Sequence, residues 1–194
     1  MGKELDSEWY DQVYRTSDIY KRKANQIKAY YPIWSQTIQI LDGFEKIKTI
    51  VDLGCGPGHF ASMIDTRKYQ IKGYDFSKVA IQQAQKRCPE GNFHCVDLTT
   101  ANFCLESDAY VSHEFFEHIE PDLEIIQQIP TGKLCIFSVP GFDSSGHVRH
   151  FKNKTEVWNR YRELLTFISI VQIGKLYLTV ARRNTHTLKN QGTL

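Results

Sequence analysis

The stretch VDLGCGPGHF, residues 51–60, decides the fold that we expect for this chain. An apolar run leads into it, and Gly54, Gly56 and Gly58 follow at alternate positions. Glycine lets a backbone bend sharply and lets a ligand approach it closely. A strand, a glycine-rich turn and a helix form the nucleotide-binding arrangement of doubly wound folds. The stretch therefore predicts a helix over residues 59–65 and a ligand above the turn.

The residues around the glycines indicate the charge of that ligand. The dinucleotide fingerprint GxGxxG needs its third glycine at the position where His59 stands. Asp52 precedes the turn, and its carboxylate would repel a pyrophosphate but attract an ammonium or a sulfonium. We therefore expect a positively charged nucleoside rather than a diphosphate.

Downstream of the turn, short apolar runs alternate with helical stretches, which is typical of a parallel sheet with helices on both faces. The expected strands are 49–53, 70–75, 92–96, 108–112 and 133–139, and the further helices are 78–87, 120–128 and 155–164. Two last apolar runs, 166–173 and 175–182, are joined almost directly. So short a link permits only an antiparallel pair.

The first 42 residues have a helical pattern rich in tyrosine and tryptophan, and Pro32 suits the first turn of a new helix. We expect a helical lid here, with Tyr14 and Tyr20 as its contacts to the ligand. The alternative is a surface on which the bases of a nucleic-acid strand stack. One domain is expected over residues 1–194, with a lid (1–42), an α/β core (43–183) and a polar tail (184–194).

Acidic residues follow the second and third expected strands. Asp75 comes about 20 positions after the turn, where doubly wound folds bind a ribose diol. Phe76 can pack on an adenine face. Asp97, followed by Leu98, can accept a hydrogen bond from the exocyclic amine of adenine.

VDLGCGPG, GYD at 73–75, VDL at 96–98 and the late antiparallel pair together resemble class I S-adenosylmethionine-dependent methyltransferases, over about residues 50–139. The resemblance implies a Rossmann-like sheet of seven strands with an antiparallel last strand. It also implies S-adenosylmethionine as cofactor and S-adenosylhomocysteine as product. The expected cofactor-binding residues are Tyr14, Tyr20, Asp52, Gly54, Cys55, Gly56, Gly58, Asp75, Phe76, Asp97, Leu98 and His113.

Two groups of acidic residues and histidines follow the fourth and fifth expected strands. SHEFFEHI (112–119) places Glu114 and His118 at helical spacing, and GFDSSGHVRHF (141–151) contains His147 and Arg149. Methyl transfer to a hydroxyl or a protonated amine requires the loss of a proton, which calls for a base or a metal. We expect Glu114, His118 and His147 to be catalytic and a small molecule to be methylated on O or N.

An ExxEH pattern followed by a later histidine can also hold a divalent cation. It is similar to patterns in small-RNA terminal-ribose methyltransferases, where such residues bind metal, and in ubiquinone-pathway O-methyltransferases. A metal-assisted RNA ribose 2′-O-methyltransferase is therefore one alternative. A non-catalytic S-adenosylmethionine-binding subunit is another, whereas Asp52 and His59 argue against a nicotinamide-dependent oxidoreductase. We favour a site without metal.

Composition sets the remaining expectations. With 24 basic and 22 acidic residues among 194, the net charge of +2 gives no reason to expect nucleic acid. No apolar run approaches the ~20 residues of a membrane helix, and the N-terminus lacks a secretory signal. Five cysteines without a CxxC pair argue against a disulfide framework or a zinc site. We expect a cytoplasmic protein and leave its oligomeric state open.

Overall fold

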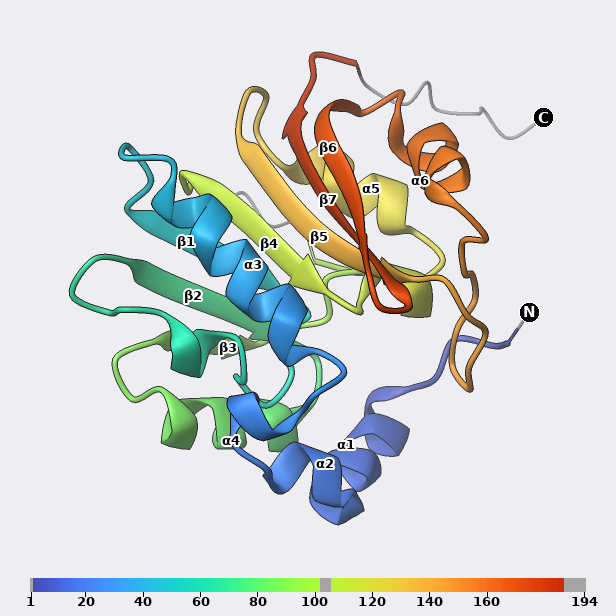
Figure 1. Ribbon diagram of the computed structural model, residues 1–194. Coiled ribbons are helices and arrows are strands. Elements are labelled where there is room, and N and C mark those ends of the chain that lie inside the picture. The colour runs from blue at the N-terminus through green and yellow to red at the C-terminus, as the bar shows by residue number, and fades with distance from the viewer. Residues whose placement is uncertain (1, 102–105, 187–194) are drawn as a thin grey trace.

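A computed structural model describes residues 2–101 and 106–186 (Figure 1). Within this part, a seven-stranded sheet has the order β3-β2-β1-β4-β5-β7-β6. The strands are β1 (Thr49–Leu53), β2 (Gln70–Asp75), β3 (Asn92–Cys95), β4 (Ala109–His113), β5 (Leu134–Pro140), β6 (Leu165–Ile173) and β7 (Leu176–Arg183). β1 to β5 pair in parallel, and β7 is antiparallel to both of its neighbours. The expected Rossmann-like sheet with an antiparallel last strand is confirmed.

Three of the described helices begin where a short polar side chain caps them. They are α1 (Ser7–Thr16), α2 (Asp18–Lys21), α3 (Tyr31–Asp42), α4 (Lys78–Arg87), α5 (Asp122–Gln128) and α6 (Lys154–Tyr161), with single 3-10 turns η1 (Ala24–Gln26), η2 (Ala61–Met63) and η3 (Phe116–His118). Asp6, Ser77 and Asn153 each accept a hydrogen bond from the backbone N–H three residues later. These bonds fix the starts of α1, α4 and α6.

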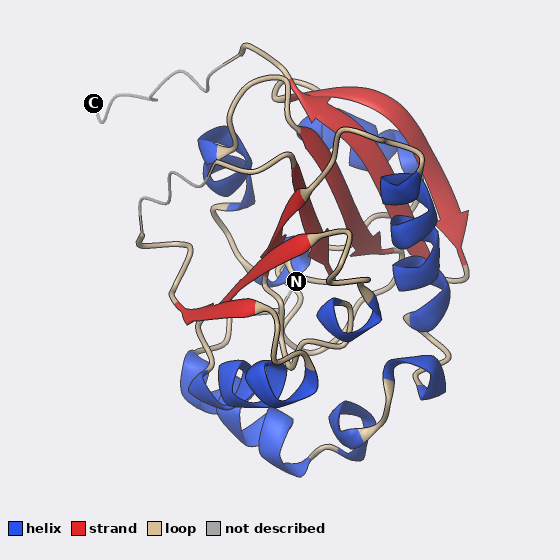
Figure 2. Cartoon of the chain, turned by 90° about the vertical axis from the view of Figure 1, so that its left-hand side faces the viewer, coloured by secondary structure: helices blue, strands red, loops and turns tan. Residues whose placement is uncertain are grey.

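Apolar residues alternate between two cores, one on each face of the sheet. Ile50 of β1 packs in the core that contains Ile33 of α3, whereas its neighbour Val51 packs in the core that contains Ile125 of α5. This alternation follows from the opposite directions of successive side chains in a strand. Figure 2 shows helices on both sides of the sheet and a further group beyond one end of it. None of the described helices is long and apolar enough to span a membrane.

The prediction of a helix over residues 59–65 is wrong, because only the single 3-10 turn η2 forms there. Met63 and Ile64 donate their N–H groups to carbonyls three residues earlier, and the Ser62 hydroxyl donates to the His59 carbonyl at 2.7 Å. Ile64 is then extended and buried, which ends the turn. The face that a longer helix would cover is covered by α3. No helix dipole therefore points at a ligand from this turn.

Helices α1 and α2 lie beyond one end of the sheet and are bonded to α4 (Figure 1). Asp11 of α1 accepts hydrogen bonds from the Ser77 hydroxyl at 2.5 Å and from the Val79 N–H at 3.2 Å. Arg87 donates to the Tyr20 carbonyl at 2.8 Å. We call residues 2–30 the N-terminal cover. Of the residues 1–42 expected as a lid, those of α3 pack in the core; the expected tail lies outside the described residues from 187 onward.

Candidate functional site

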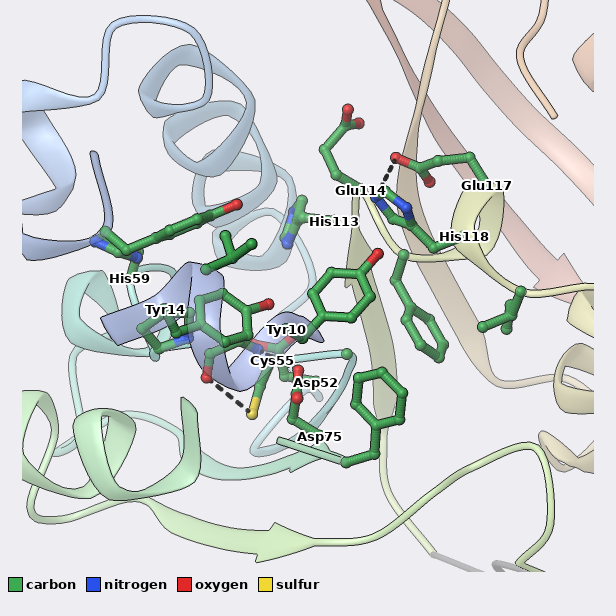
Figure 3. A pocket seen from close by; sticks show the side chains of 18 of the residues that line it. Tyr10, Tyr14, Asp52, Cys55, His59, Asp75, His113, Glu114, Glu117 and His118 are labelled. Carbon is green, nitrogen blue, oxygen red and sulfur yellow. Dashed lines mark hydrogen bonds and ion pairs between the residues drawn. The ribbon is translucent and has the colours of Figure 1, made fainter. Parts of the chain in front are cut away.

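A cavity of about 350 Å³ lies between the N-terminal cover and the carboxyl ends of β1 to β5 (Figure 3). It brings together residues that are expected from three separate parts of the sequence. The expected cofactor-binding residues that line it are Tyr14, Tyr20, Asp52, Gly54, Cys55, Gly56, Asp75, Phe76, Asp97, Leu98 and His113. Glu114, His118 and His147, expected to be catalytic, line the same cavity.

Gly58 is the exception, because it does not line the cavity. Its φ of +76° is one that favours glycine, and a Cβ built on it would lie 2.8 Å from the Cα of Ala84 in α4. Gly58 is therefore placed against α4 and not at the cavity where we expected it to bind the cofactor. This glycine lets α4 pack closely against the turn.

We expect Gly58→Ala to lower the free energy of unfolding by about 2–5 kcal/mol, since left-handed strain costs ~1–2 kcal/mol and overpacking ~1–3 kcal/mol. Gly132→Ala is the matched control, because Gly132 also has a positive φ (+83°) but its Cβ would meet nothing within 4 Å. The Gly132→Ala control should lose only the ~1–2 kcal/mol of unfolding free energy that left-handed strain costs. Urea unfolding of both variants measures the difference, and equal losses would contradict the close contact with Ala84.

Asp52 has a buried carboxylate at the glycine turn. Its side chain is 2% exposed, and its Oδ2 has no hydrogen-bond partner. Burial, followed by the nearby charge of Asp75, raises the pKa of Asp52 to about 8. An unpartnered buried carboxylate is costly unless a ligand satisfies it. The turn therefore fits a ligand that brings a positive charge or N–H donors.

Asp75 and Asp97 hold the backbone around the same end of the cavity. The carboxylate of Asp75 accepts hydrogen bonds from the N–H groups of Gly56 and Ser77, both at 2.9 Å. Burial raises the pKa of Asp75 to about 6, while these two N–H groups lower it. Asp97 accepts from the N–H and the hydroxyl of Thr99 through one oxygen. Asp75 is the last residue of β2, and Asp97 lies two residues beyond the end of β3.

Glu114 and Glu117 stand at the other end of the cavity, after β4. Glu114 has a φ of 53°, which is positive at no other non-glycine residue of the described part, and its Oε1 accepts from the Ser138 hydroxyl at 2.9 Å. Glu117 is fully buried, and neither of its carboxyl oxygens has a hydrogen-bond partner. Burial raises the pKa of Glu114 to about 7 and that of Glu117 well above its ordinary value. Glu117, whose Oε1 lies 3.8 Å from the Nε2 of His118, is therefore available to a ligand that donates hydrogen bonds.

The contacts of His118 and His147 fix their tautomers. Nδ1 of His118 lies 3.0 Å from the Gly146 carbonyl, and Nδ1 of His147 lies 3.2 Å from the Phe142 carbonyl. Because a carbonyl only accepts, each Nδ1 carries the proton and each Nε2 keeps a lone pair. Burial lowers the pKa of His118 to about 4 and also lowers that of His147. One atom each of Glu117, His118 and His147 lies within 4.8 Å of the others, so they could hold a metal ion.

His113, at the end of β4, is half-buried and lines the cavity together with these groups. Its Nε2 lies 3.0 Å from the Thr37 hydroxyl of α3, and its Nδ1 has no partner. Burial lowers the pKa of His113 to about 3, so the ring is neutral. His113 therefore joins the packed core to the middle of the cavity wall.

Tyr10 is a cavity residue that the sequence reasoning missed. Its buried hydroxyl has no hydrogen-bond partner and points toward Glu117 and His118 (Figure 3). Its ring lies edge-on to that of His118, with centroids 5.8 Å apart. The spacing in the sequence could have indicated Tyr10 as a cavity residue, because Tyr10 and Tyr14 are four residues apart on one helix and share a face.

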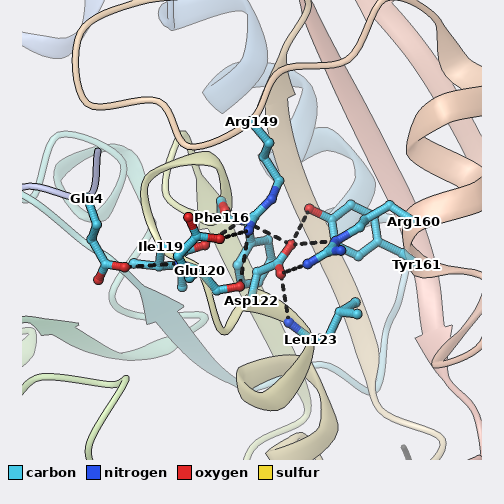
Figure 4. Close-up of polar contacts among 9 residues, drawn as sticks. All are labelled: Glu4, Phe116, Ile119, Glu120, Asp122, Leu123, Arg149, Arg160 and Tyr161. Carbon is cyan, nitrogen blue, oxygen red and sulfur yellow. Dashed lines mark hydrogen bonds and ion pairs between the residues drawn. The ribbon is translucent and has the colours of Figure 1, made fainter. Parts of the chain in front are cut away.

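Arg149, grouped with His147 in the sequence, does not line the cavity. Its guanidinium donates to the carbonyls of Phe116, Ile119 and Glu120 and pairs with Asp122 at 3.3 Å (Figure 4). It therefore holds the backbone of the turn on which Glu117 and His118 stand.

Comparison with known proteins finds similarity to methyltransferases. Residues 50–130 match a methyltransferase domain family. Trans-aconitate 2-methyltransferase of Agrobacterium fabrum strain C58 is 26% identical over 125 residues, which cover 62% of this chain and 44% of that relative. The chain thus spans less than half the length of this curated relative.

Solved structures of methyltransferases share the fold. Magnesium protoporphyrin IX methyltransferase of Synechocystis PCC 6803 with bound S-adenosylmethionine superposes with a TM-score of 0.71 at 13% identity, covering 95% of this chain and 100% of that one. Burkholderia thailandensis 1,6-didemethyltoxoflavin-N1-methyltransferase with S-adenosylhomocysteine gives 0.72 at 14% identity, covering 92% and 87%. At these identities the solved structures show a shared fold, and the family match concerns residues 50–130.

Proposed function

We propose that this protein is an S-adenosylmethionine-dependent methyltransferase that acts on an O or N atom of a small molecule. The observation that carries the proposal is the unpartnered carboxylate oxygen of Asp52 beside the glycine turn, in the segment that matches a methyltransferase domain. Asp52 and the backbone of Gly54 to Gly56 would hold the methionine part, Asp75 the ribose and Asp97 the adenine. When bound, the cofactor supplies a methyl group on a positively charged sulfur.

On the acceptor side, the chain would orient the nucleophile and remove its proton. His118 and His147 are neutral and keep a lone pair on Nε2, so either can take a proton, and Glu114 is the further candidate. Tyr10, Tyr14 and Tyr20 would exclude water from the cavity. Holding the nucleophile in line with the methyl group would supply much of the remaining rate acceleration. A cytoplasmic location is part of the proposal, supported by the free cysteines of the described part.

Calorimetric titration with S-adenosylhomocysteine tests the proposal, with NADH as the comparison. We expect micromolar binding of the homocysteine compound and no measurable binding of NADH, because Asp52 would face the pyrophosphate. Tight binding of NADH alone would instead support an oxidoreductase. Binding without methyl transfer to any acceptor would support the non-catalytic subunit.

The pKa of Asp52 predicts a proton-linked affinity. At pH 7 the free protein holds a proton on Asp52, since its pKa is raised to about 8. A cationic ligand favours the ionised form, so binding should release close to one proton and strengthen from pH 6 to pH 8. Calorimetry in two buffers with different ionisation enthalpies measures the release. Asp52→Asn should abolish it, and an affinity independent of pH would contradict the prediction.

One observation favours a second candidate, metal-assisted methylation of a hydroxyl such as an RNA ribose 2′-hydroxyl. Glu117 has no hydrogen-bond partner, and the Nδ1–H groups of His118 and His147 donate to backbone carbonyls, as in most metal-binding histidines, which leaves each Nε2 lone pair available. Electron paramagnetic resonance of added Mn²⁺ tests this candidate. Bound Mn²⁺ that is lost in His147→Ala, together with Mn²⁺-stimulated activity on RNA ends, would support it; free Mn²⁺ would exclude it.

A further inference from the structure

We propose that the acceptor presents a protonated amine to Glu117, and that molecules with a carboxylate or phosphate at this place are rejected. The inference rests on the proposed function and names its substrate class. It is carried by the charges and the hydrogen-bonding groups of the acceptor half of the cavity, taken together with the burial of Glu117.

The cavity is lined by acidic side chains and by no lysine or arginine of the described residues. Its acidic lining residues are Glu4, Asp52, Asp75, Asp97, Glu114 and Glu117. An anionic acceptor would therefore meet no opposite charge, whereas charge complementarity usually decides which partner such a site admits.

Most of these carboxylates already have a role or a partner. Asp52, Asp75 and Asp97 lie at the cofactor end, and Glu114 is bonded to Ser138. Glu117 remains: it is fully buried, neither of its carboxyl oxygens has a hydrogen-bond partner, and the Nε2 of His118 lies 3.8 Å from its Oε1. An ionised carboxylate in this state would cost several kcal/mol relative to a paired one, so burial raises the pKa of Glu117. A cationic ligand that donates hydrogen bonds would stabilise its ionised form.

The groups beside Glu117 also need a donor. His118 and His147 each present an Nε2 lone pair, and the Tyr10 hydroxyl has no partner and can accept. An ammonium carries three donors and no acceptor, so it matches a set of acceptors that a carboxylate or phosphate cannot satisfy. The faces of aromatic lining residues add a further attraction for a cation.

The N-terminal cover closes this end of the cavity over a small group. Gly2 donates its N–H to the His147 carbonyl at 2.9 Å, and a Cβ on Gly146 would lie 2.9 Å from Leu5. An amine on a slender chain fits such a closed end better than a branched acid does. In the transfer, the nitrogen bonds to the methyl carbon and the carbon–sulfur bond breaks with its electron pair on sulfur. The proton that the ammonium loses passes to Glu117.

The test compares amine and acid probes of equal size. The protein is freed of metal with EDTA and saturated with S-adenosylhomocysteine, and calorimetry then measures binding of tyramine against 3-(4-hydroxyphenyl)propionate and tryptamine against indole-3-propionate. We expect at least one amine to bind about tenfold or more tighter than its acid partner, a difference of ~1.4 kcal/mol. Glu117→Gln should remove the preference, while Glu124→Gln, an exposed residue of α5, should keep it.

Equal binding, a preference for the acids, or no binding of any probe would overturn the inference. So would an acid that binds only after Mn²⁺ is added, because the positive charge would then come from a metal. These outcomes leave binding of S-adenosylhomocysteine intact. Loss of that binding would instead count against the proposed function.

Discussion

Asp75→Ala is expected to weaken binding of S-adenosylhomocysteine by at least about 100-fold, or roughly 3 kcal/mol, since hydrogen bonds to a charged group contribute ~1.5–3 kcal/mol each. Under the proposed function, Asp75 binds the ribose hydroxyls. It also accepts the N–H of Gly56, so its loss loosens the glycine turn itself. Calorimetric titration of the purified variant measures the effect. Unchanged affinity would remove Asp75 from the cofactor site.

Asp108→Ala is the matched control for this experiment. Asp108 also accepts two backbone N–H groups, those of Lys48 and Thr49, at 2.9 and 3.0 Å. It does so where β1 begins, at the opposite end of the strands from the cavity. We expect this variant to lose stability and to keep its affinity. If both variants lost affinity alike, the effect of Asp75→Ala would come from a weakened fold.

Asp122→Ala is expected to lower the free energy of unfolding by about 3–5 kcal/mol, the usual cost of removing one partner from a buried ion pair. Asp122 is fully buried and pairs with Arg160 at 2.5 Å and with Arg149 at 3.3 Å, while the Tyr161 hydroxyl donates to it at 3.0 Å (Figure 4). Its loss leaves these donors without their acceptor. For a domain stabilised by ~5–15 kcal/mol, this is a large fraction.

Urea unfolding measures this loss, with Asp18→Ala as the control. Asp18 also pairs with a basic residue, Lys21 at 3.0 Å, but its side chain is 84% exposed. An exposed pair contributes ~0–1 kcal/mol, so the control should change little. Similar losses in the two variants would show that the contacts of Asp122 do not stabilise the fold.

The strands and the cofactor end of the site could be predicted because local patterns determine them. Parallel strands place their carboxyl ends at one edge, so residues that end a strand, such as Asp75 and His113, lie close together whatever the conformation of the loops. Glu114 and His118 were predictable for the same reason. The cavity lining confirms that these residues meet, while their chemical roles stay predictions.

Tertiary packing decided the parts that the sequence could not show. The segment after the glycines forms only a single 3-10 turn, and α3, which precedes β1, packs in the same core as this turn. Gly58 resembles a ligand-binding glycine in the sequence, yet its neighbour is Ala84. Arg149 resembles a site residue but binds carbonyls behind the turn. Each of these depends on a contact between residues distant in the chain.

The N-terminal cover is bonded to the core on both sides of the cavity. Asp11 fastens it to α4, and at the other side Gly2 bonds to His147 and Glu4 accepts the N–H of Glu120 at 3.1 Å. We expect a product to leave when one side of the cover detaches, and the side held by the exposed hydrogen bond between Glu4 and Glu120 to detach first. Turnover should then slow as solvent viscosity rises, and a rate insensitive to viscosity would contradict this. The opening of a few N-terminal residues would then be the rate-limiting step of the catalytic cycle.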